Sequence, residues 1–411
     1  MRVFTKRSPS SRARAICMLF ALRLTACFSP DRGDESAVSD VTDDDTSTSG
    51  AGGPENDDTD SSHDGSRFAP SNIDLDDLDV EGVQDVVLAE NSSIFTDNGG
   101  LLRTSSHYTF QEVSQPSGAR LGVFVVRSLL IEETATVTVV GANALVIVAL
   151  DAIEIRGSLI AAATSHGSGP GGFASPSGDE QPGAGPGGGA AGSSRHAAGG
   201  GSSCGIGGTG GASAGTMVGP GGSPAGSAEL TPLLGGSAGG SGGVGRGGGG
   251  GGAVHLAARR EIILGPSSVI HVGGGGGTHA GVFDPSGAST QNASGGGSGG
   301  AILLEAPSVT ALGRLAANGG GGGGAHRGND ATASSTPAPG GPGDAARSAG
   351  GSGSAATTVD GEPGSGMLDA TGGGGGGGAG RIRVNTSTGE AALGGTMSPS
   401  MDTNCVTQGV I

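Results

Sequence analysis

A short unit of alternating apolar residues that leads to a glycine recurs along this chain. It runs from Val146 to Gly157, again from Val254 to Gly265 and again from Ile302 to Gly313, and a looser copy begins at Ile382. Alternation with a period of two indicates strands that bury one face and leave the other in water. Repetition of one such unit is typical of a stacked solenoid. The sequence therefore predicts an all-β fold built from parallel β-helix or β-solenoid-like coils.

The same frame predicts which side chains point into the core. They are Val146, Val148, Leu150, Ile153 and Ile155 in the first copy, Val254, Leu256, Ala258 and Ile263 in the second, Ile302, Leu304, Ala306, Val309 and Ala311 in the third, and Ile382 and Val384 in the fourth. The glycine at one fixed offset predicts a bend that a side chain would block. Glu261 would also point inward, which indicates either a bulge in that copy or a register that slips by one residue.

Glycine is concentrated in the C-terminal part, because only twelve of the 91 glycines precede Ala161. Long glycine-rich insertions separate the coils, at residues 166–252, 273–300 and 319–378. Unbroken glycine runs adjoin the coils, so each insertion is expected to leave the solenoid at one edge and return there. Bare backbones could pack together near the coils as left-handed polyglycine strands, as on the collagen axis. Without hydrogen bonds between strands the insertions would be flexible, since ordering glycine costs much entropy.

The first 26 residues have the order of an export signal. Basic residues precede an apolar run, Ala15–Leu22, that is too short to span a bilayer. The sequence Leu24-Thr25-Ala26-Cys27 then looks like a bacterial lipobox, although Arg23 departs from a good signal. We therefore expect residues 1–26 to be a lipoprotein signal peptide and Cys27 to carry the lipid anchor. Plain secretion is the alternative.

Acidic residues dominate the segment 27–79. From Asp31 to Glu90, nineteen acidic residues are opposed only by Arg32 and Arg67, a local balance equal to the net charge of −17. A segment with so few apolar residues cannot offset its chain entropy by burial, and like charges extend it. We predict a disordered linker that holds the rest of the chain away from a membrane.

The remaining chain divides into two β-rich parts. Residues 80–165 are predicted to form the N-terminal part of the solenoid, with strands near residues 86–88, 108–110, 123–126, 129–131 and 137–140. A small β-sandwich would show the same strand density and stays open for this part. After the insertion at 166–252, residues 253–411 hold the remaining coils, and the atypical last copy is expected to cap the stack.

Three stretches of this chain resemble a set of uncharacterised glycine-rich surface lipoproteins of the myxobacterial type. The stretches are Gly122–Leu129, Gly300–Pro307 and Gly380–Val384. The resemblance covers most of the chain from about Val80 onward. It implies a β-rich protein that is anchored at the cell surface, and it carries no catalytic residue across.

Cysteine content allows one disulfide in the body of the protein. Cys17 and Cys27 lie in the N-terminal apolar segment, which leaves Cys204 and Cys405. In an exported protein these two could pair and close a very long loop. Two unpaired thiols are the alternative.

Most motifs for chemistry are absent or without the context that they need. The Gly-x-Ser-x-Gly matches at 235–239, 239–243 and 296–300 lie in glycine-rich loops, not between a strand and a helix. Lys6 is the only lysine, so neither a phosphate-binding lysine loop nor a basic surface for nucleic acid is present. The histidines lack metal-ligand spacing. We therefore expect no metal and no cofactor.

A polysaccharide-active β-helix hydrolase or lyase is the enzymatic alternative. Such a site needs two carboxylates, or a carboxylate with an arginine, on the outer faces of neighbouring coils. The outward residues include Asp151, Glu154 and Arg259, with Asn385 in line with Glu305. No stacked pair of acids emerges.

The favoured interpretation is a non-enzymatic, lipid-anchored protein of the outer membrane or cell surface. Its role would be structural or adhesive, through contact with other cells, matrix or polysaccharide. Arg259, Arg381 and Arg383 are the candidates for contact with anionic glycans. Their alternative role is to solubilise an outer face.

Overall fold

The computed structural model describes residues 68–411 apart from 102–104, 166, 176–177, 214–216, 244, 282–290 and 368–369. The predicted signal peptide, the lipidation site Cys27 and most of the acidic linker lie outside the described residues. Within the described part the chain is all-β, with one short 3₁₀ helix, η1 (Leu75–Asp77). No helix there has the length and apolar character needed to cross a bilayer.

The described strands form three sheets, and every pairing is parallel except that of β3 with β4. Sheet A contains β1 (Asp85–Leu88), β5 (Ser128–Ile131), β8 (Ala152–Ile155), β11 (Glu261–Leu264), β14 (Ser308–Ala311) and β17 (Ala392–Leu393). Sheet B contains β2 (Ser92–Phe95), β6 (Thr136–Val140), β9 (Ser158–Ile160), β12 (Val269–His271), β15 (Arg314–Ala316) and β18 (Thr396–Ser398). Sheet C contains β3 (Thr109–Val113), β4 (Leu121–Val126), β7 (Ala144–Ala149), β10 (Ala253–Ala258), β13 (Ala301–Glu305), β16 (Arg381–Thr386) and β19 (Val406–Val410).

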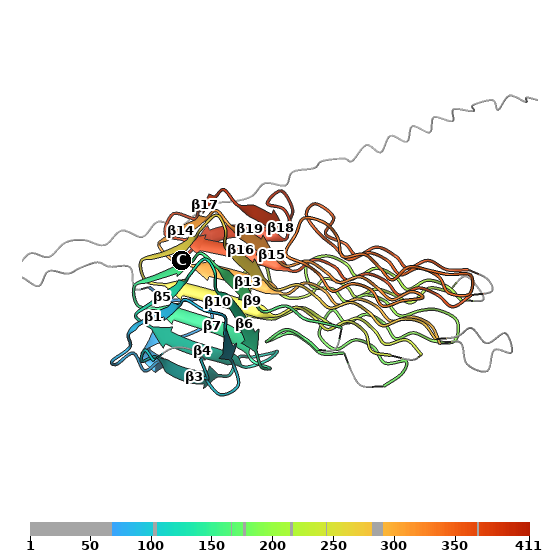
Figure 1. The fold of residues 1–411 in the computed structure, drawn as a ribbon, viewed down its shortest axis with the longest axis horizontal. Coiled ribbons are helices and arrows are strands. Elements are labelled where there is room, and N and C mark those ends of the chain that lie inside the picture. The colour runs from blue at the N-terminus through green and yellow to red at the C-terminus, as the bar shows by residue number, and fades with distance from the viewer. Residues whose placement is uncertain are drawn as a thin grey trace, which may run out of the picture. The chain divides into compact units, whose positions relative to one another are not determined.

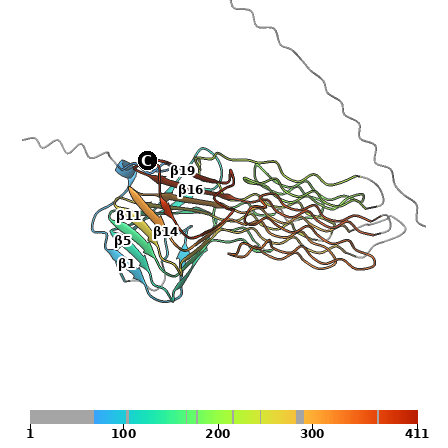
Figure 2. The same cartoon turned by 90° about the horizontal axis from the view of Figure 1, so that it is seen from above.

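From β4 onward the chain visits the sheets in one repeating order, C then A then B. The strands β7, β8 and β9 make one turn, and β10, β11 and β12 make the next, so each sheet gains one strand per turn. Figure 1 shows the strands of sheet C stacked turn upon turn, and Figure 2 shows strands of sheet A stacked in the same way. This three-sheet body is compatible with a β-solenoid.

One hydrophobic core fills the space between the three sheets. Each turn contributes apolar residues from all three sheets, as Ile147, Ile153 and Leu159 do in one turn and Leu256, Ile262 and Ile270 do in the next. Parallel pairing places equivalent residues of successive turns side by side, so the apolar side chains form continuous rows. The predicted inward residues of the third and fourth copies all lie in this core, from Ile302 to Ala311 and at Ile382 and Val384.

Two parts of the predicted register are wrong by one residue. Leu145 and Ile147 of β7 point into the core, whereas Val146 and Val148 lie on the outer face of sheet C and Leu150 packs against the cluster on that face. In β11 the core residues are Ile262 and Leu264, so Ile263 and Glu261 do not point inward. The alternative of a slipped register is therefore correct for β11, which pairs without a bulge with β8 and β14.

The error in β7 arises because sheet C is buried on both faces. All six residues of β7 are buried, and a second apolar cluster covers its outer face. This cluster includes Ile73 and Leu78 from the N-terminal segment and Leu230 and Leu233 from the first insertion. A continuous apolar run has no period of two, so its inward face cannot be read from the sequence.

The N-terminal segment from Phe68 is packed, which moves the end of the predicted disordered linker. Its side chains Ile73 and Leu78 are less than a tenth exposed. The amide nitrogen of Ser71 donates to Glu305 and the side chain of Asn72 donates to the carbonyl of Leu230. Residues 68–79 were expected to be disordered, but they cover the outer face of sheet C.

The recurrent glycine at the predicted bend is required by close packing in some turns but not in all of them. A Cβ atom on Gly157 would lie 2.2 Å from the carbonyl oxygen of Glu132 and 2.3 Å from that of Ala135, so only glycine fits. A Cβ on Gly313 would lie 2.7 Å from the carbonyl oxygen of Gly265. At Gly265 itself the nearest atom would be 3.6 Å away, so this bend leaves room for a side chain.

All three glycine-rich insertions leave and rejoin the three-sheet body at the same corner. Residues 161–252, 272–300 and 317–380 each follow a strand of sheet B and precede a strand of sheet C. Figures 1 and 2 show the segments of these insertions running side by side, away from the sheets. We call this assembly the glycine bundle.

Candidate functional site

Backbone hydrogen bonds hold the glycine bundle together with a period of three residues. Along residues 373–378 the amides donate in rotation to carbonyls of three neighbouring segments. Gly373 donates to Ser365 and Gly376 to Glu362 in the first segment, and Gly374 donates to Gly323 and Gly377 to Gly320 in the second. Gly375 donates to Ala198 and Gly378 to Gly201 in the third. The carbonyls of residues 371–379 accept from three further segments, 204–211, 293–299 and 348–354. Three residues per turn without internal hydrogen bonds is the geometry of a polyproline II helix. The segment is thus packed among six others, and the packed alternative for the insertions is the one observed.

At many interior positions of the glycine bundle there is no room for a side chain. A Cβ on Gly376 would lie 1.9 Å from the carbonyl oxygen of Ser352, and one on Gly205 would lie 1.8 Å from that of Val359. Such distances are far below any contact between carbon and oxygen. Glycine is required here because backbones lie directly against backbones, not because of left-handed torsion angles.

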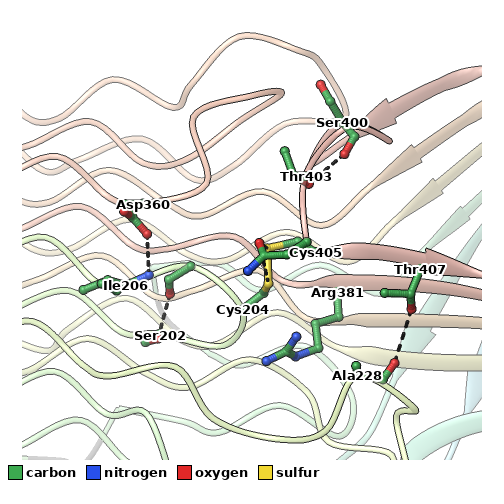
Figure 3. The surroundings of a disulfide bond; sticks show 12 residues. Ser202, Cys204, Ile206, Ala228, Asp360, Arg381, Ser400, Thr403, Cys405 and Thr407 are labelled. Atoms are coloured by element: carbon green, nitrogen blue, oxygen red, sulfur yellow. Dashed lines mark hydrogen bonds between the residues drawn. A yellow bond between two sulfur atoms is a disulfide. The ribbon is translucent and has the colours of Figure 1, made fainter. Parts of the chain in front are cut away.

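A disulfide joins the glycine bundle to the last turn of the three-sheet body. Cys204 and Cys405 are bonded, with their Cα atoms 5.7 Å apart and a sequence separation of 201. Cys204 belongs to the first insertion and Cys405 lies immediately before β19 (Figure 3). Beside it, the amides of Cys204 and Gly205 both donate to the carbonyl of Ala379. The pair that the sequence left open is therefore joined, and it ties the first insertion to the last turn of the three-sheet body.

The three arginines proposed for glycan contact do not converge on one site. Arg259 is exposed and follows the end of β10, whereas Arg381 begins β16. Arg381 stands in register with Ala253 through Ala301, so Arg259 lies six residues further along the sheet, about 20 Å away. Arg381 and Arg383 are half-buried on the outer face of sheet C. The structure thus places Arg259 at the exposed surface and Arg381 and Arg383 in half-buried positions.

A buried polar cluster is centred on Glu305 at the outer face of sheet C. Its Oε2 lies 2.7 Å from Nε2 of His255, and its Oε1 accepts from Nδ2 of Asn385 at 2.7 Å. Ser71 donates its backbone amide to Oε2 at 2.8 Å and its hydroxyl to Oε1. Both His255 and Glu305 are fully buried. The predicted alignment of Asn385 with Glu305 is confirmed by the pairing of β13 with β16.

The contacts of this cluster stabilise a charge and do not assemble a nucleophile. Burial alone would raise the pKa of Glu305, but the hydrogen bond and charge of His255, with the two hydrogen bonds from Ser71, lower it to about 2. The Ser71 hydroxyl donates to the Glu305 carboxylate, whose lowered pKa makes it a weak base, and not to the imidazole of His255, so the serine is poorly activated as a nucleophile. The cluster fastens the N-terminal segment to sheet C.

A surface trough lies along the corner between sheets A and B. Two hollows of about 280 and 190 Å³ share Pro266, Ser267 and Leu312. Charged residues border them, namely Glu133, Glu154 and Arg156 on one hollow and Arg314 on the other. Ser267 donates to Glu133 at 2.8 Å, and Arg156 pairs with Glu154 at 2.6 Å.

Sequence reasoning considered Glu154 as an outward acid but did not group it with the other residues that line this trough. Arg156, Pro266 and Leu312 each adjoin the recurrent glycine of their copy, at Gly157, Gly265 and Gly313. Since that glycine marks the same corner in every turn, its neighbours could have been grouped from the sequence. Asp151, the other outward acid considered, pairs instead with Arg260, whose hydrogen bond lowers the pKa of Asp151.

Half-exposed apolar side chains occur on neighbouring segments of the glycine bundle. The segment 204–212 lies between 218–225 and 359–366, to which it is joined by backbone hydrogen bonds. Ile206, Val218 and Met367 are each about half exposed on these segments or next to them. A hollow of about 310 Å³ there is lined by Thr209, Val218, Met367 and neighbouring glycines.

Among the described residues, no group of three or more His, Cys, Asp or Glu side chains could hold a metal ion.

Comparison with protein families, with curated proteins and with solved structures found no match to this chain. Its function must therefore be argued from its own geometry.

Proposed function

We propose that this chain is a non-enzymatic protein of the cell surface with a structural or adhesive role. In this proposal the three-sheet body is a β-solenoid anchored through Cys27, and the glycine bundle is a stiff projection that contacts a polysaccharide or another surface component. The observation that carries it is the threefold pattern of backbone bonds around residues 373–378. Such a pattern supports a rod whose interior holds few and mostly small side chains, which suits a spacer or contact element better than an active site.

The expected stiffness follows from where the polar backbone groups are bonded. Each hydrogen bond contributes only about 0.5–1.5 kcal/mol net, but an unpaired buried amide would cost about 1–3 kcal/mol. Opening one segment would therefore leave unpaired groups on six neighbours at once. A stiff projection needs segments that resist opening cooperatively in this way.

The apolar face defined by Ile206, Val218 and Met367 is the proposed contact surface. Val218 and Met367 are both about half exposed and line one hollow, and apolar side chains gathered at a hollow favour recognition over chance. The sugar rings of a polysaccharide offer apolar C–H faces that such a surface can cover. The exposed carboxylate of Asp360 is adjacent, where it accepts from the amide of Ile206 at 2.7 Å.

Hydrogen exchange and binding together test this proposal. Amides of residues 372–380 in the mature chain are expected to exchange as slowly as those of β7 and β10. Val218→Asp with Met367→Asp is expected to abolish retention on the native cell envelope or its polysaccharide, while Val87→Asp on sheet A is expected to leave it intact. Fast exchange throughout the bundle would contradict the stiff projection, and unchanged retention of the double variant would contradict the contact face.

A polysaccharide-active enzyme is the second candidate, and the trough with Glu133 and Glu154 favours it. Both carboxylates border one hollow, as hydrolysis requires, although each is already bonded to a neighbour. Release of reducing ends from a panel of polysaccharides would support an enzyme if Glu133→Gln or Glu154→Gln removed it. Absence of release by the wild-type chain would favour the structural role.

A further inference from the structure

Arg381 is a half-buried cation without a carboxylate partner. It begins β16, at the junction between sheet C and the glycine bundle, close to the disulfide (Figure 3). Burial lowers its pKa, and Glu229 opposes this only through its charge, since it forms no ion pair with Arg381 in the described part of the chain. A guanidinium removed from water in this way needs a compensating negative charge.

The hydrogen-bonding capacity of Arg381 is also largely unused. Nη2 donates to the carbonyl of Ala225 over 3.4 Å, which is a long contact. Nε is buried and has no partner in the described structure. A planar guanidinium with a free buried N–H is suited to a charge-assisted hydrogen bond with an anion.

The group lines a small pocket that also presents hydroxyls. Ser203 and Ser237, both more than nine-tenths buried, line it together with Ser227. The Ser237 oxygen accepts from the amide of Gly187 at 3.0 Å, which leaves its own hydrogen free to be donated into the pocket. The pocket therefore offers donors from a guanidinium and from the hydroxyls of Ser203 and Ser237, whereas the hydroxyl of Ser227 already donates to the carbonyl of Thr231 at 3.1 Å.

The free space in this pocket admits one small ligand. It gives about 10 Å³ to the centre of a water-sized sphere, which is close to the room that one buried water needs. An oxyanion such as sulfate is too large to enter whole. A water molecule could satisfy Nε but would leave the exposed Glu229, which forms no ion pair with Arg381 in the described part of the chain, as its source of negative charge.

We propose that Arg381 anchors a binding site for one small monovalent anion, with chloride as the probe. The anion accepts from Nε of Arg381 and from the serine hydroxyls. It thereby connects β16 to the loop around Ala225 and to the base of the glycine bundle. The site does not depend on the adhesive role proposed above, because it concerns the joint between the two parts of the molecule.

Thermal unfolding of the mature chain at constant ionic strength tests the site. Replacing sodium gluconate, whose anion is too large for the pocket, by sodium chloride is expected to raise the unfolding midpoint saturably, by about 2–4 °C. Arg381→Met should abolish this difference, and Arg381→Lys, which keeps the charge but lacks Nε, should weaken it. Arg259→Met is the matched control at an exposed arginine and should respond like the wild type.

Bromide gives a direct reading of the location. Crystals of the wild-type chain grown in bromide should show anomalous scattering beside Nε of Arg381, and crystals of Arg381→Lys should show less. An equal response to gluconate and chloride would overturn the proposal, and so would a chloride response that survives in a folded Arg381→Met chain. A water molecule in place of bromide beside Nε would overturn it as well.

Discussion

The amide of Gly296 donates to the carbonyl of Gly375 at 2.9 Å, which joins the second insertion to the third. Neither residue has a side chain with which to recognise the other. The contact is nevertheless specific, because each segment must present its amides at intervals of three residues to the correct neighbour. The glycine bundle is therefore ordered by hydrogen-bond geometry and by the space that missing side chains leave.

Adding one methyl group inside the bundle should be costly. In Gly376→Ala the new Cβ would lie 1.9 Å from the carbonyl oxygen of Ser352, so two backbones must separate. We expect a loss of about 1–3 kcal/mol or more in the free energy of unfolding, measured by chemical denaturation. Gly167→Ala is the control, because no atom lies within 4 Å of its Cβ position. It should be neutral or slightly stabilising. Equal losses in the two variants would contradict the packing.

The disulfide should contribute substantially to stability. It closes a loop of 201 residues, and removing a native disulfide typically costs about 2–5 kcal/mol. Reduction of the wild-type chain should therefore lower its midpoint of denaturation. The variant with both Cys204→Ala and Cys405→Ala should have the lower midpoint of denaturation without reductant, and adding reductant should not change it. A reductant effect of similar size in that variant would show that the loss has another origin.

Acid should weaken the attachment of the N-terminal segment. The folded-state pKa of Glu305 is lowered to about 2 from the ordinary 4.5. Its contribution to stability, roughly 3 kcal/mol, is therefore complete above pH 4.5 and is lost as the pH falls towards 2. Protease cleavage within residues 68–79 should accelerate over that range. In Glu305→Gln the acceleration should be smaller, and in Asp344→Asn, an exposed control, it should be unchanged. An identical pH dependence in Glu305→Gln would argue against this assignment.

Side-chain truncation should distinguish the two faces of the sheets. Ile147 lies in the central core, whereas Val87 on sheet A is 45% exposed. Ile147→Ala should lower the free energy of unfolding by about 2–5 kcal/mol, and Val87→Ala by no more than about 0.5 kcal/mol. Comparable effects at both positions, measured by denaturant titration, would mean that the register of β7 or β1 is not the one described.

The sequence by itself determined the repeated coils, their strand-rich composition and the points where the glycine insertions interrupt them. Apolar residues two apart and a glycine at a fixed offset are local signals, and local signals survive without knowledge of distant contacts. They placed Ile302, Leu304 and Ile382 in the core correctly.

Only the tertiary structure decided which face of β7 points inward, because Leu230 and Ile73 arrive from distant segments and bury its other face. It also decided that Cys204 meets Cys405 and that Ser71 reaches Glu305 across 234 residues. The sequence also could not predict which glycine segments would be hydrogen-bonded to each other. These segments are chemically alike and differ only in the strand after which each one leaves the three-sheet body. The physical reason is the same in each case: backbone groups and buried polar atoms choose partners by position in space, and position follows from the completed stack of strands.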